Sequence, residues 1–165
     1  LPDGRRQITG FLFSGDFIGL TAGATYAFSA EAIEDTTVCR FRASEYRALA
    51  RERPSLEAAL LSRAMHELTA AQDQMLLLGR KTACERLASF LVTMLSRDPL
   101  RPAGDNAVRL PMTRSEIADY LGLTIETVSR ELTKLKTSGV IHAVSLHDLR
   151  IERPDRLKDM ANGES

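Results

Sequence analysis

Three polar side chains that suit DNA recognition stand close together in the last third of the sequence: Glu126, Ser129 and Arg130. If this segment is an α-helix, positions i, i+3 and i+4 share one face, so all three side chains would point the same way. Arginine can donate two hydrogen bonds to O6 and N7 of guanine, glutamate can accept one from N4 of cytosine, and serine can bond several base edges. A simpler alternative is an i,i+4 salt bridge between Glu126 and Arg130 on a solvated face.

Two short helices are predicted around this trio. Thr113 and Glu116 form a T-x-x-E capping box that begins the first helix, and Gly122 is expected to end it. Thr124 can cap the second helix, which we expect to run to about Ser138. Glycine at the next position then stops it.

The second helix also has an apolar face, formed by Val128, Leu132 and Leu135. After it, residues 140–145 and 149–154 alternate between apolar and polar side chains, which predicts a β-hairpin. Helix, glycine turn, helix and hairpin is the order of a winged helix-turn-helix. The first turns of its recognition helix enter the major groove, where the trio would lie, so this context favours base contact over a surface salt bridge.

Phosphate contacts are expected at the N-termini of the two helices, where unpaired backbone N–H groups favour anions. The candidates are Thr113, Arg114, Thr124 and Thr127. Acidic and basic residues nearly balance between Arg101 and Arg150, and the whole chain has 22 of each. Affinity for DNA would therefore depend on the placement of charges and on two copies binding together.

A longer helix is predicted from Pro54 to Leu78. Its apolar side chains recur at spacings of three and four, with no charge among them. They are Leu61, Ala64, Leu68, Ala71, Met75 and Leu78. Such a stripe is typical of a helix packed on its own domain and equally of a dimer seam. The length of this helix and its place between two predicted domains favour the dimer seam.

The N-terminal region, residues 1–43, is predicted to be part of a β domain. Residues 7–13 and 37–41 alternate like short strands between glycines. A short helix capped by Ser44 should follow, and another helix is expected over residues 82–96. A proline-containing linker over residues 98–112 should end in a short strand.

Several classes of protein do not fit the sequence. No apolar run is long enough to span a membrane, and no P-loop, metalloprotease or serine-hydrolase motif is present, so we expect a cytoplasmic protein without enzymatic activity. The three histidines are scattered, with no metal-ligand spacing. The two cysteines make no disulfide framework.

Three stretches of the chain, residues 15–20, 72–91 and 112–130, resemble the CRP/FNR family of bacterial transcription regulators, most closely its FNR/FixK branch. The resemblance implies an α+β fold. Its parts would be the C-terminal part of a β-roll (cyclic-nucleotide-binding-like) sensor domain, a long dimerisation helix and a winged helix-turn-helix DNA-binding domain. The first half of the β-roll would then be missing here.

Three domains follow from this resemblance: a partial sensor domain at 1–53, the dimerisation helix at 54–79 and the DNA-binding domain at 80–165. It also implies a homodimer that binds double-stranded DNA and contacts RNA polymerase. In related activators an exposed turn touches the sigma factor. The corresponding residues here are Gly4, Arg5 and Arg6, although an ordinary solvated hairpin tip is an equal alternative.

In the FNR/FixK branch an E-x-x-S-R triplet reads a TTGAT half-site, which implies base-reading roles for Glu126, Ser129 and Arg130. The cyclic-AMP branch has an arginine just before the glutamate, where this chain has Ile125. The resemblance therefore implies a TTGAT-N4-ATCAA-like palindrome, read by a regulator that responds to low oxygen.

The means of sensing stays open. In residues 19–32 neither the phosphate-binding glutamate nor the arginine of cyclic-nucleotide-binding members is in place, which argues against a nucleotide effector. Cys39 matches the interior cysteine ligand of the [4Fe–4S] cluster in oxygen-sensing members, but four thiolates are needed and this chain has no other in place. A small buried strand residue is the alternative for Cys39. We therefore expect no cofactor in this chain, unless upstream cysteines complete a cluster.

The competing functions are an iron–sulfur redox sensor and a module that only dimerises.

Overall fold

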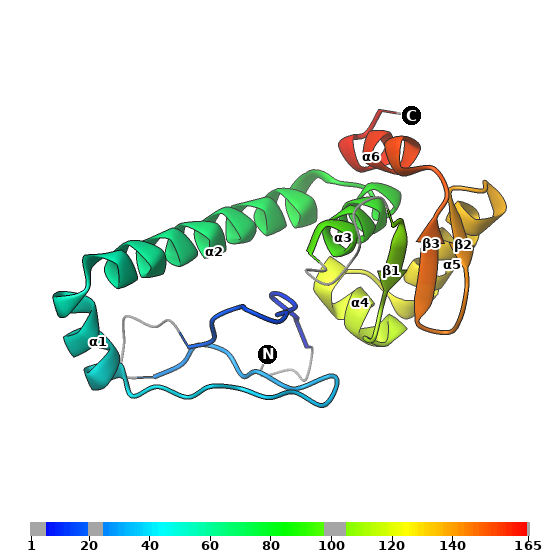
Figure 1. Cartoon of the computed structure of the whole chain (residues 1–165). Helices are drawn as coiled ribbons and strands as arrows, with labels where there is room; N and C mark the ends of the chain where they lie inside the picture. The colour runs from blue at the N-terminus through cyan, green and yellow to red at the C-terminus, as the bar shows by residue number, and fades with distance from the viewer. Residues whose placement is uncertain (1–5, 20–24, 98–104, 165) are drawn as a thin grey trace. The chain divides into compact units, whose positions relative to one another are not determined.

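The computed structural model describes residues 6–19, 25–97 and 105–164. The described residues form an α+β fold, as predicted, with helices packed beside one small antiparallel sheet (Figure 1). The elements are α1 (Ala43–Glu52), α2 (Pro54–Arg80), α3 (Ala83–Arg97), β1 (Ala107–Arg109), α4 (Arg114–Leu121), α5 (Ile125–Thr137), β2 (Ile141–Ala143), β3 (Asp148–Ile151) and α6 (Pro154–Asn162).

Two compact units divide the chain. The first joins Leu1–Ser14 to Gln74–Ser165, and the second is Gly15–Asp73. The predicted domain boundaries at residues 53 and 79 stay a prediction. No described helix combines the length and the apolarity needed to cross a membrane.

Helix α3 is the centre of the first unit. It buries Leu87, Phe90, Leu91 and Met94, which recur at spacings of three and four along one face. This face packs against α4, α5, α6 and β1, and Figure 1 shows α6 lying against α3. The predicted helix over residues 82–96 is thus confirmed, within one residue at either end.

The sheet has the order β1–β3–β2, with both pairs antiparallel. On β3, Leu149 and Ile151 are buried while Arg150 is exposed, the alternation expected of a strand with one wet face. The predicted hairpin between β2 and β3 is confirmed, as is the short strand after the linker. Helix α6 was not predicted, although Pro154 at its first position is a common start signal.

The capping box and the terminal glycine predicted for the first short helix are confirmed in α4. The Thr113 hydroxyl accepts a hydrogen bond from the Glu116 N–H at 3.2 Å, and the Glu116 carboxylate accepts one from the Thr113 N–H at 2.7 Å. Gly122 ends α4 with a φ of 61°. A Cβ at this position would lie 3.2 Å from the Leu78 side chain. Glycine therefore allows both the positive φ and the close approach of Leu78 to the backbone.

Arg86 joins the end of α2 to the end of α4. Its guanidinium donates to the carbonyl oxygens of Leu78 and Lys81 at 2.9 Å, and to that of Leu121 at 3.0 Å. The last carbonyls of a helix lack partners within the helix and carry the negative end of its dipole. One cation therefore satisfies the C-termini of two helices at once. The role of Arg86 was not predicted from the sequence.

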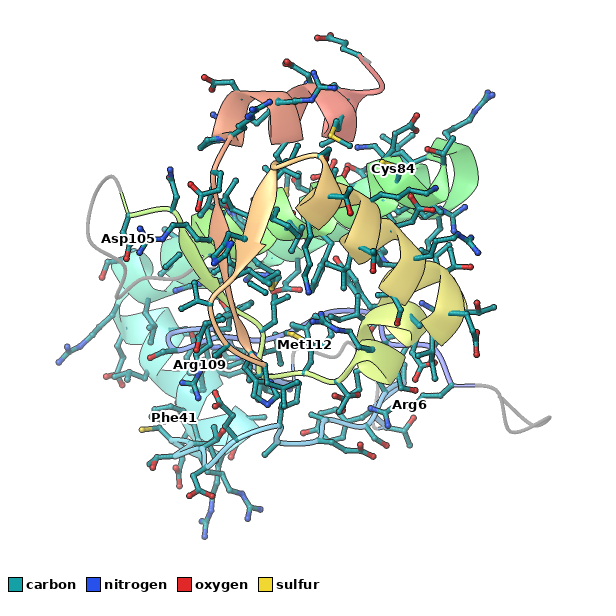
Figure 2. The ribbon with its side chains drawn as sticks, turned by 90° about the vertical axis from the view of Figure 1, so that its right-hand side faces the viewer. Arg6, Phe41, Cys84, Asp105, Arg109 and Met112 are labelled. Atoms are coloured by element: carbon teal, nitrogen blue, oxygen red, sulfur yellow. The ribbon has the colours of Figure 1, made fainter. Side chains whose placement is uncertain are left out.

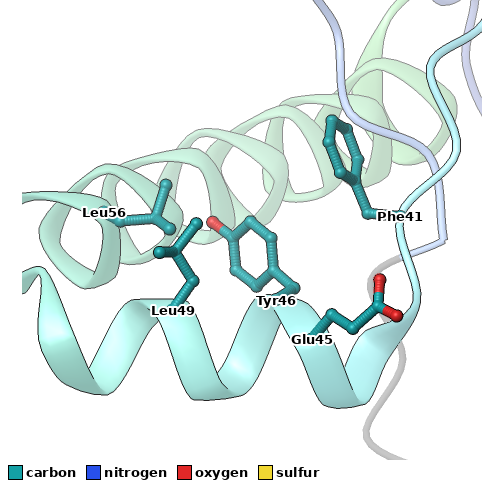
Figure 3. A pocket seen from close by; sticks show the side chains of 5 residues that line it. All are labelled: Phe41, Glu45, Tyr46, Leu49 and Leu56. Atoms are coloured by element: carbon teal, nitrogen blue, oxygen red, sulfur yellow. The ribbon is translucent and has the colours of Figure 1, made fainter.

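In the second unit, α1 and the beginning of α2 enclose a shallow, mainly apolar pocket. Its lining is formed by Phe41, Glu45, Tyr46, Leu49 and Leu56 (Figure 3). The aromatic ring of Phe17 approaches that of Tyr46, with 6.1 Å between the ring centroids. This small cluster stabilises the turn from α1 into α2.

Two predictions for the N-terminal region are wrong. No strand forms within residues 6–19 and 25–42, the part of that region that the structure describes, because a strand requires a neighbour to complete its backbone hydrogen bonds. Val38 and Phe41 are accordingly exposed. The helix predicted to be capped by Ser44 begins at Ala43, after Arg42, without a side-chain cap.

Residues 6–13 pack instead on the rest of the first unit, to which they belong. Phe11 is buried, and its ring centroid lies 6.0 Å from that of Phe90 and 5.2 Å from that of Tyr120. The Ile8 N–H donates to the Asp119 carbonyl oxygen at 3.3 Å. The alternating apolar pattern of this segment therefore serves side-chain packing against α3 and α4.

Replacing Arg86 with methionine should lower the free energy of unfolding by about 2 kcal/mol, because part-buried carbonyl oxygens lose their donor while the unbranched apolar stem of the side chain is kept. Urea unfolding followed by circular dichroism would measure this loss. Arg80→Met is the matched control, since Arg80 is an exposed arginine in the last turn of α2. Equal stability of the two variants would contradict the role assigned to Arg86.

Candidate nucleic-acid interface

Helix α5 has two distinct faces. Val128, Leu132 and Leu135 are buried in the core, as predicted. Glu126, Ser129 and Arg130 are exposed on the other side of the helix. The burial of the first face fixes the rotation of the helix about its axis, so the polar trio is presented to solvent as one group.

Glu126 is held as an anion at the beginning of α5. The backbone N–H of Glu126 lowers the pKa of its carboxyl group most, and the neighbouring Thr124 hydroxyl lowers it further. The residue lies in the first turn, where a negative charge is also favoured by the helix dipole. An ionised carboxylate is a pure acceptor, which is the form needed to bind an exocyclic amino group.

Arg130 is oriented by its neighbours on α5. Its Nε lies 3.5 Å from Oε1 of Glu131, and its Nη2 donates to the Thr127 hydroxyl at 3.4 Å. Within the described part of the chain, Glu126 and Arg130 form no ion pair with each other. The surface salt bridge considered as the alternative is therefore absent, and the charged partner of Arg130 is Glu131 instead.

The four predicted phosphate-contacting residues all lie at the beginning of α4 or α5. Thr113 and Thr124 are the N-cap residues, and their hydroxyl groups accept hydrogen bonds from the backbone. Arg114 is half-buried, and burial lowers its pKa, although a guanidinium keeps its charge. The Thr127 hydroxyl is hydrogen-bonded to Thr124 and Arg130. Contact of these residues with phosphate stays a prediction.

The helix-turn-helix region of this chain matches a known type of domain. The Crp-like helix-turn-helix domain matches residues 85–160. The nitrogen fixation regulation protein FixK of Bradyrhizobium diazoefficiens is 44% identical over 161 residues, which span 98% of this chain and 68% of that protein. The transcriptional activatory protein AadR of Rhodopseudomonas palustris is 45% identical, over 98% of this chain and 67% of that protein.

A solved structure agrees with these relatives. FixK2 from Bradyrhizobium japonicum superposes with a TM-score of 0.89 and 42% identity, covering 97% of this chain and 79% of that one. The chain belongs to the CRP/FNR family of transcription regulators. Its relatives place it in the FNR/FixK branch.

In this CRP/FNR chain the predicted dimer stripe lies on α2, a helix of 27 residues with only Leu77 buried. Leu61, Leu68 and Met75 are 64%, 51% and 65% exposed, respectively. Ala64 and Ala71 are exposed between them. Five of the six predicted seam residues thus present a continuous apolar surface along the helix.

Leu78, the sixth residue of the stripe, behaves differently. It is half-buried and packs against the hydrophobic core of its own chain, close to Gly122. Its apolar spacing therefore reflects packing on the helix-turn-helix, at least in part. A participation of Leu78 in a dimer seam stays a prediction.

Arg6, predicted to contact the sigma factor, lies beside α4 (Figure 2). Its guanidinium is 3.6 Å from Oε1 of Glu116 and 3.9 Å from Oδ2 of Asp119. Part of its charge is thus already engaged within the chain. Gly4 and Arg5, the other two residues of that prediction, lie outside the described residues.

The two cysteines are free and belong to different units of the chain. Cys39 is exposed and outside any strand, so its reading as a small buried strand residue is wrong. Among the described residues, no three histidine, cysteine or acidic side chains gather as metal ligands. A [4Fe–4S] cluster needs four thiolates, and the residues of this chain do not fit that cluster by themselves.

One polar residue of α5 was missed. Glu131 is buried, being 5% exposed, and its carboxylate lies beside both Arg130 and Lys134. The sequence held a signal: position 131 falls three residues after Val128 and four before Leu135, which are both core residues. Because glutamate is charged, position 131 was not predicted to face the core.

Proposed function

We propose that this CRP/FNR protein is a homodimer that reads a TTGAT-N4-ATCAA-like palindrome and acts in the response to low oxygen. The observation that carries the proposal is the face of α5, where Glu126, Ser129 and Arg130 are exposed together and Glu126 and Arg130 are not paired with each other. The half-site sequence rests on the resemblance of this triplet to that of the FNR/FixK branch.

The chemistry of the face matches the guanine–cytosine pair of a TTGAT half-site. Arg130 would donate to O6 and N7 of the guanine, and Glu126 would accept from N4 of the paired cytosine. Ser129, between them on the same face, would bond a neighbouring base edge. In this arrangement the capped beginnings of α4 and α5 would contact phosphate groups, since helix N-termini bind anions.

Two copies of the chain are needed for a palindrome. The exposed stripe on α2 would pair with the same stripe of a second copy about a two-fold axis, as in a coiled coil. The two recognition helices would then enter the major groove about 34 Å apart, one turn of DNA. Because the chain has no net charge, joining two half-sites is the means by which it would reach useful affinity.

The seam carries no charged side chain, so dimerisation would not depend on a cofactor to offset a buried charge. Control by the abundance of the protein therefore fits better than control by a cluster. The protein would act in the cytoplasm and recruit RNA polymerase. Since its relatives are transcription regulators and activators, we propose no enzymatic activity.

Replacing Arg130 with alanine should weaken binding to the TTGAT palindrome by about 1–3 kcal/mol and relax selectivity at the guanine position. The loss follows from removal of a bidentate base contact. Fluorescence anisotropy with labelled duplexes at fixed salt would measure it, with a scrambled duplex as the control. An equal loss on every duplex would instead make Arg130 a phosphate contact.

Replacing Ala71 with aspartate should weaken dimerisation at least about tenfold, because it would place two carboxylates in an apolar seam. The adjacent Ala70→Asp variant is the matched control, since Ala70 is also exposed on α2 but lies off the stripe. Sedimentation equilibrium of the two variants would compare them. Unchanged association of the Ala71 variant would rule out this seam.

A further inference from the structure

Glu131 is the single charged side chain that is buried among the described residues. It lies on α5, directly after Arg130, and faces the core between Val128 and Leu135. A buried carboxylate is costly unless a cation and hydrogen bonds compensate for its lost hydration. A carboxylate buried at this position of α5 therefore calls for a reason beyond packing.

The contacts of Glu131 show which groups compensate for it. Oε1 accepts a hydrogen bond from Nζ of Lys134 at 2.8 Å, and the same oxygen lies 3.5 Å from Nε of Arg130. The two cations are exposed, with 60% and 62% of their side chains accessible, whereas 6% of the Glu131 side chain is accessible. The buried carboxylate is thus the common partner of two exposed surface cations.

Arg130 is held at two points by this arrangement. Glu131 engages Nε, and the Thr127 hydroxyl accepts from Nη2 at 3.4 Å. A guanidinium can approach guanine either through Nε and one Nη or through both Nη nitrogens. With Nε turned toward Glu131, the second approach is the one left open. Holding a long side chain in its binding orientation also reduces the conformational entropy lost on binding.

We propose that Glu131 is a positioning residue for base recognition, acting through Arg130 so that its two terminal nitrogens meet O6 and N7 of guanine. This inference rests on the proposed function of α5. It has a second consequence, since a carboxylate so close to the DNA repels every phosphate. Glu131 would therefore weaken binding to all sequences while strengthening the discrimination between them.

The experiment compares full-chain variants on three duplexes: the TTGAT palindrome, the same duplex with both half-site guanines replaced by adenine, and a scrambled sequence. In the Glu131→Gln variant, discrimination between the first two duplexes should fall about three- to tenfold. Binding to the scrambled duplex should become tighter, because a negative charge is removed. A purely structural role for Glu131 would weaken binding to all three duplexes together.

Two further variants separate the contributions. Glu131→Asp keeps the charge but shortens the reach to Arg130, so it should lose discrimination without gaining affinity for the scrambled duplex. It also serves if Glu131→Gln folds poorly. Lys134→Gln removes the other partner of Glu131 and leaves the contact with Arg130, so it should keep the discrimination of the wild type.

A double variant tests whether Glu131 acts through Arg130. In an Arg130→Ala background, Glu131→Gln should have no further effect on discrimination at the guanine. Wild-type discrimination in both Glu131 variants, or an undiminished effect in the Arg130→Ala background, would overturn the inference. Equal binding of the wild-type protein to all three duplexes would contradict the proposed function itself and remove the basis of this inference.

Discussion

The guanidinium of Arg86 is the interaction on which the first unit of this structure depends. It donates hydrogen bonds to the last carbonyl groups of α2 and to the end of α4, at 2.9 to 3.0 Å. Two helix C-termini, which would repel each other through their dipoles, are thereby brought together on one cation. Gly122 allows this approach, because any side chain there would press on Leu78. The last turn of α2 is thus fixed to the helix-turn-helix.

On that framework, α5 combines three tasks in thirteen residues. Its apolar face anchors the helix in the core, its first turns present the groups proposed to read bases, and Glu131 is buried on the core side. The polar face is ordered without DNA, since the backbone N–H of Glu126 favours the ionised form of its carboxyl group and the Thr127 hydroxyl accepts a hydrogen bond from Arg130. A protein without net charge has little general attraction for DNA. Such preparation is therefore where its selectivity would come from.

Much of the helix-turn-helix could be predicted from sequence, because local chemistry dictates it. The capping box at Thr113, the left-handed Gly122 and the hairpin after Gly139 depend on neighbouring residues alone. Contacts between distant segments were not predictable in this way. The bonds of Arg86 reach 35 residues along the chain, and the burial of Glu131 depends on how α5 is rotated in the core. The prediction of N-terminal strands was wrong for a related reason. An alternating sequence indicates only which side chains are apolar, whereas a strand also needs a neighbouring strand to complete its backbone hydrogen bonds.

The central claim is that α5 lies in the major groove with Arg130 on guanine. Methylation of guanine N7 by dimethyl sulfate tests it most directly, because N7 is the major-groove atom to which Arg130 would donate. We would bind the full chain to a TTGAT-N4-ATCAA duplex and map the methylated guanines on both strands. Protection of the guanine in each half-site, lost in the Arg130→Ala protein, is the result expected. Specific binding with both guanines fully reactive would contradict the account.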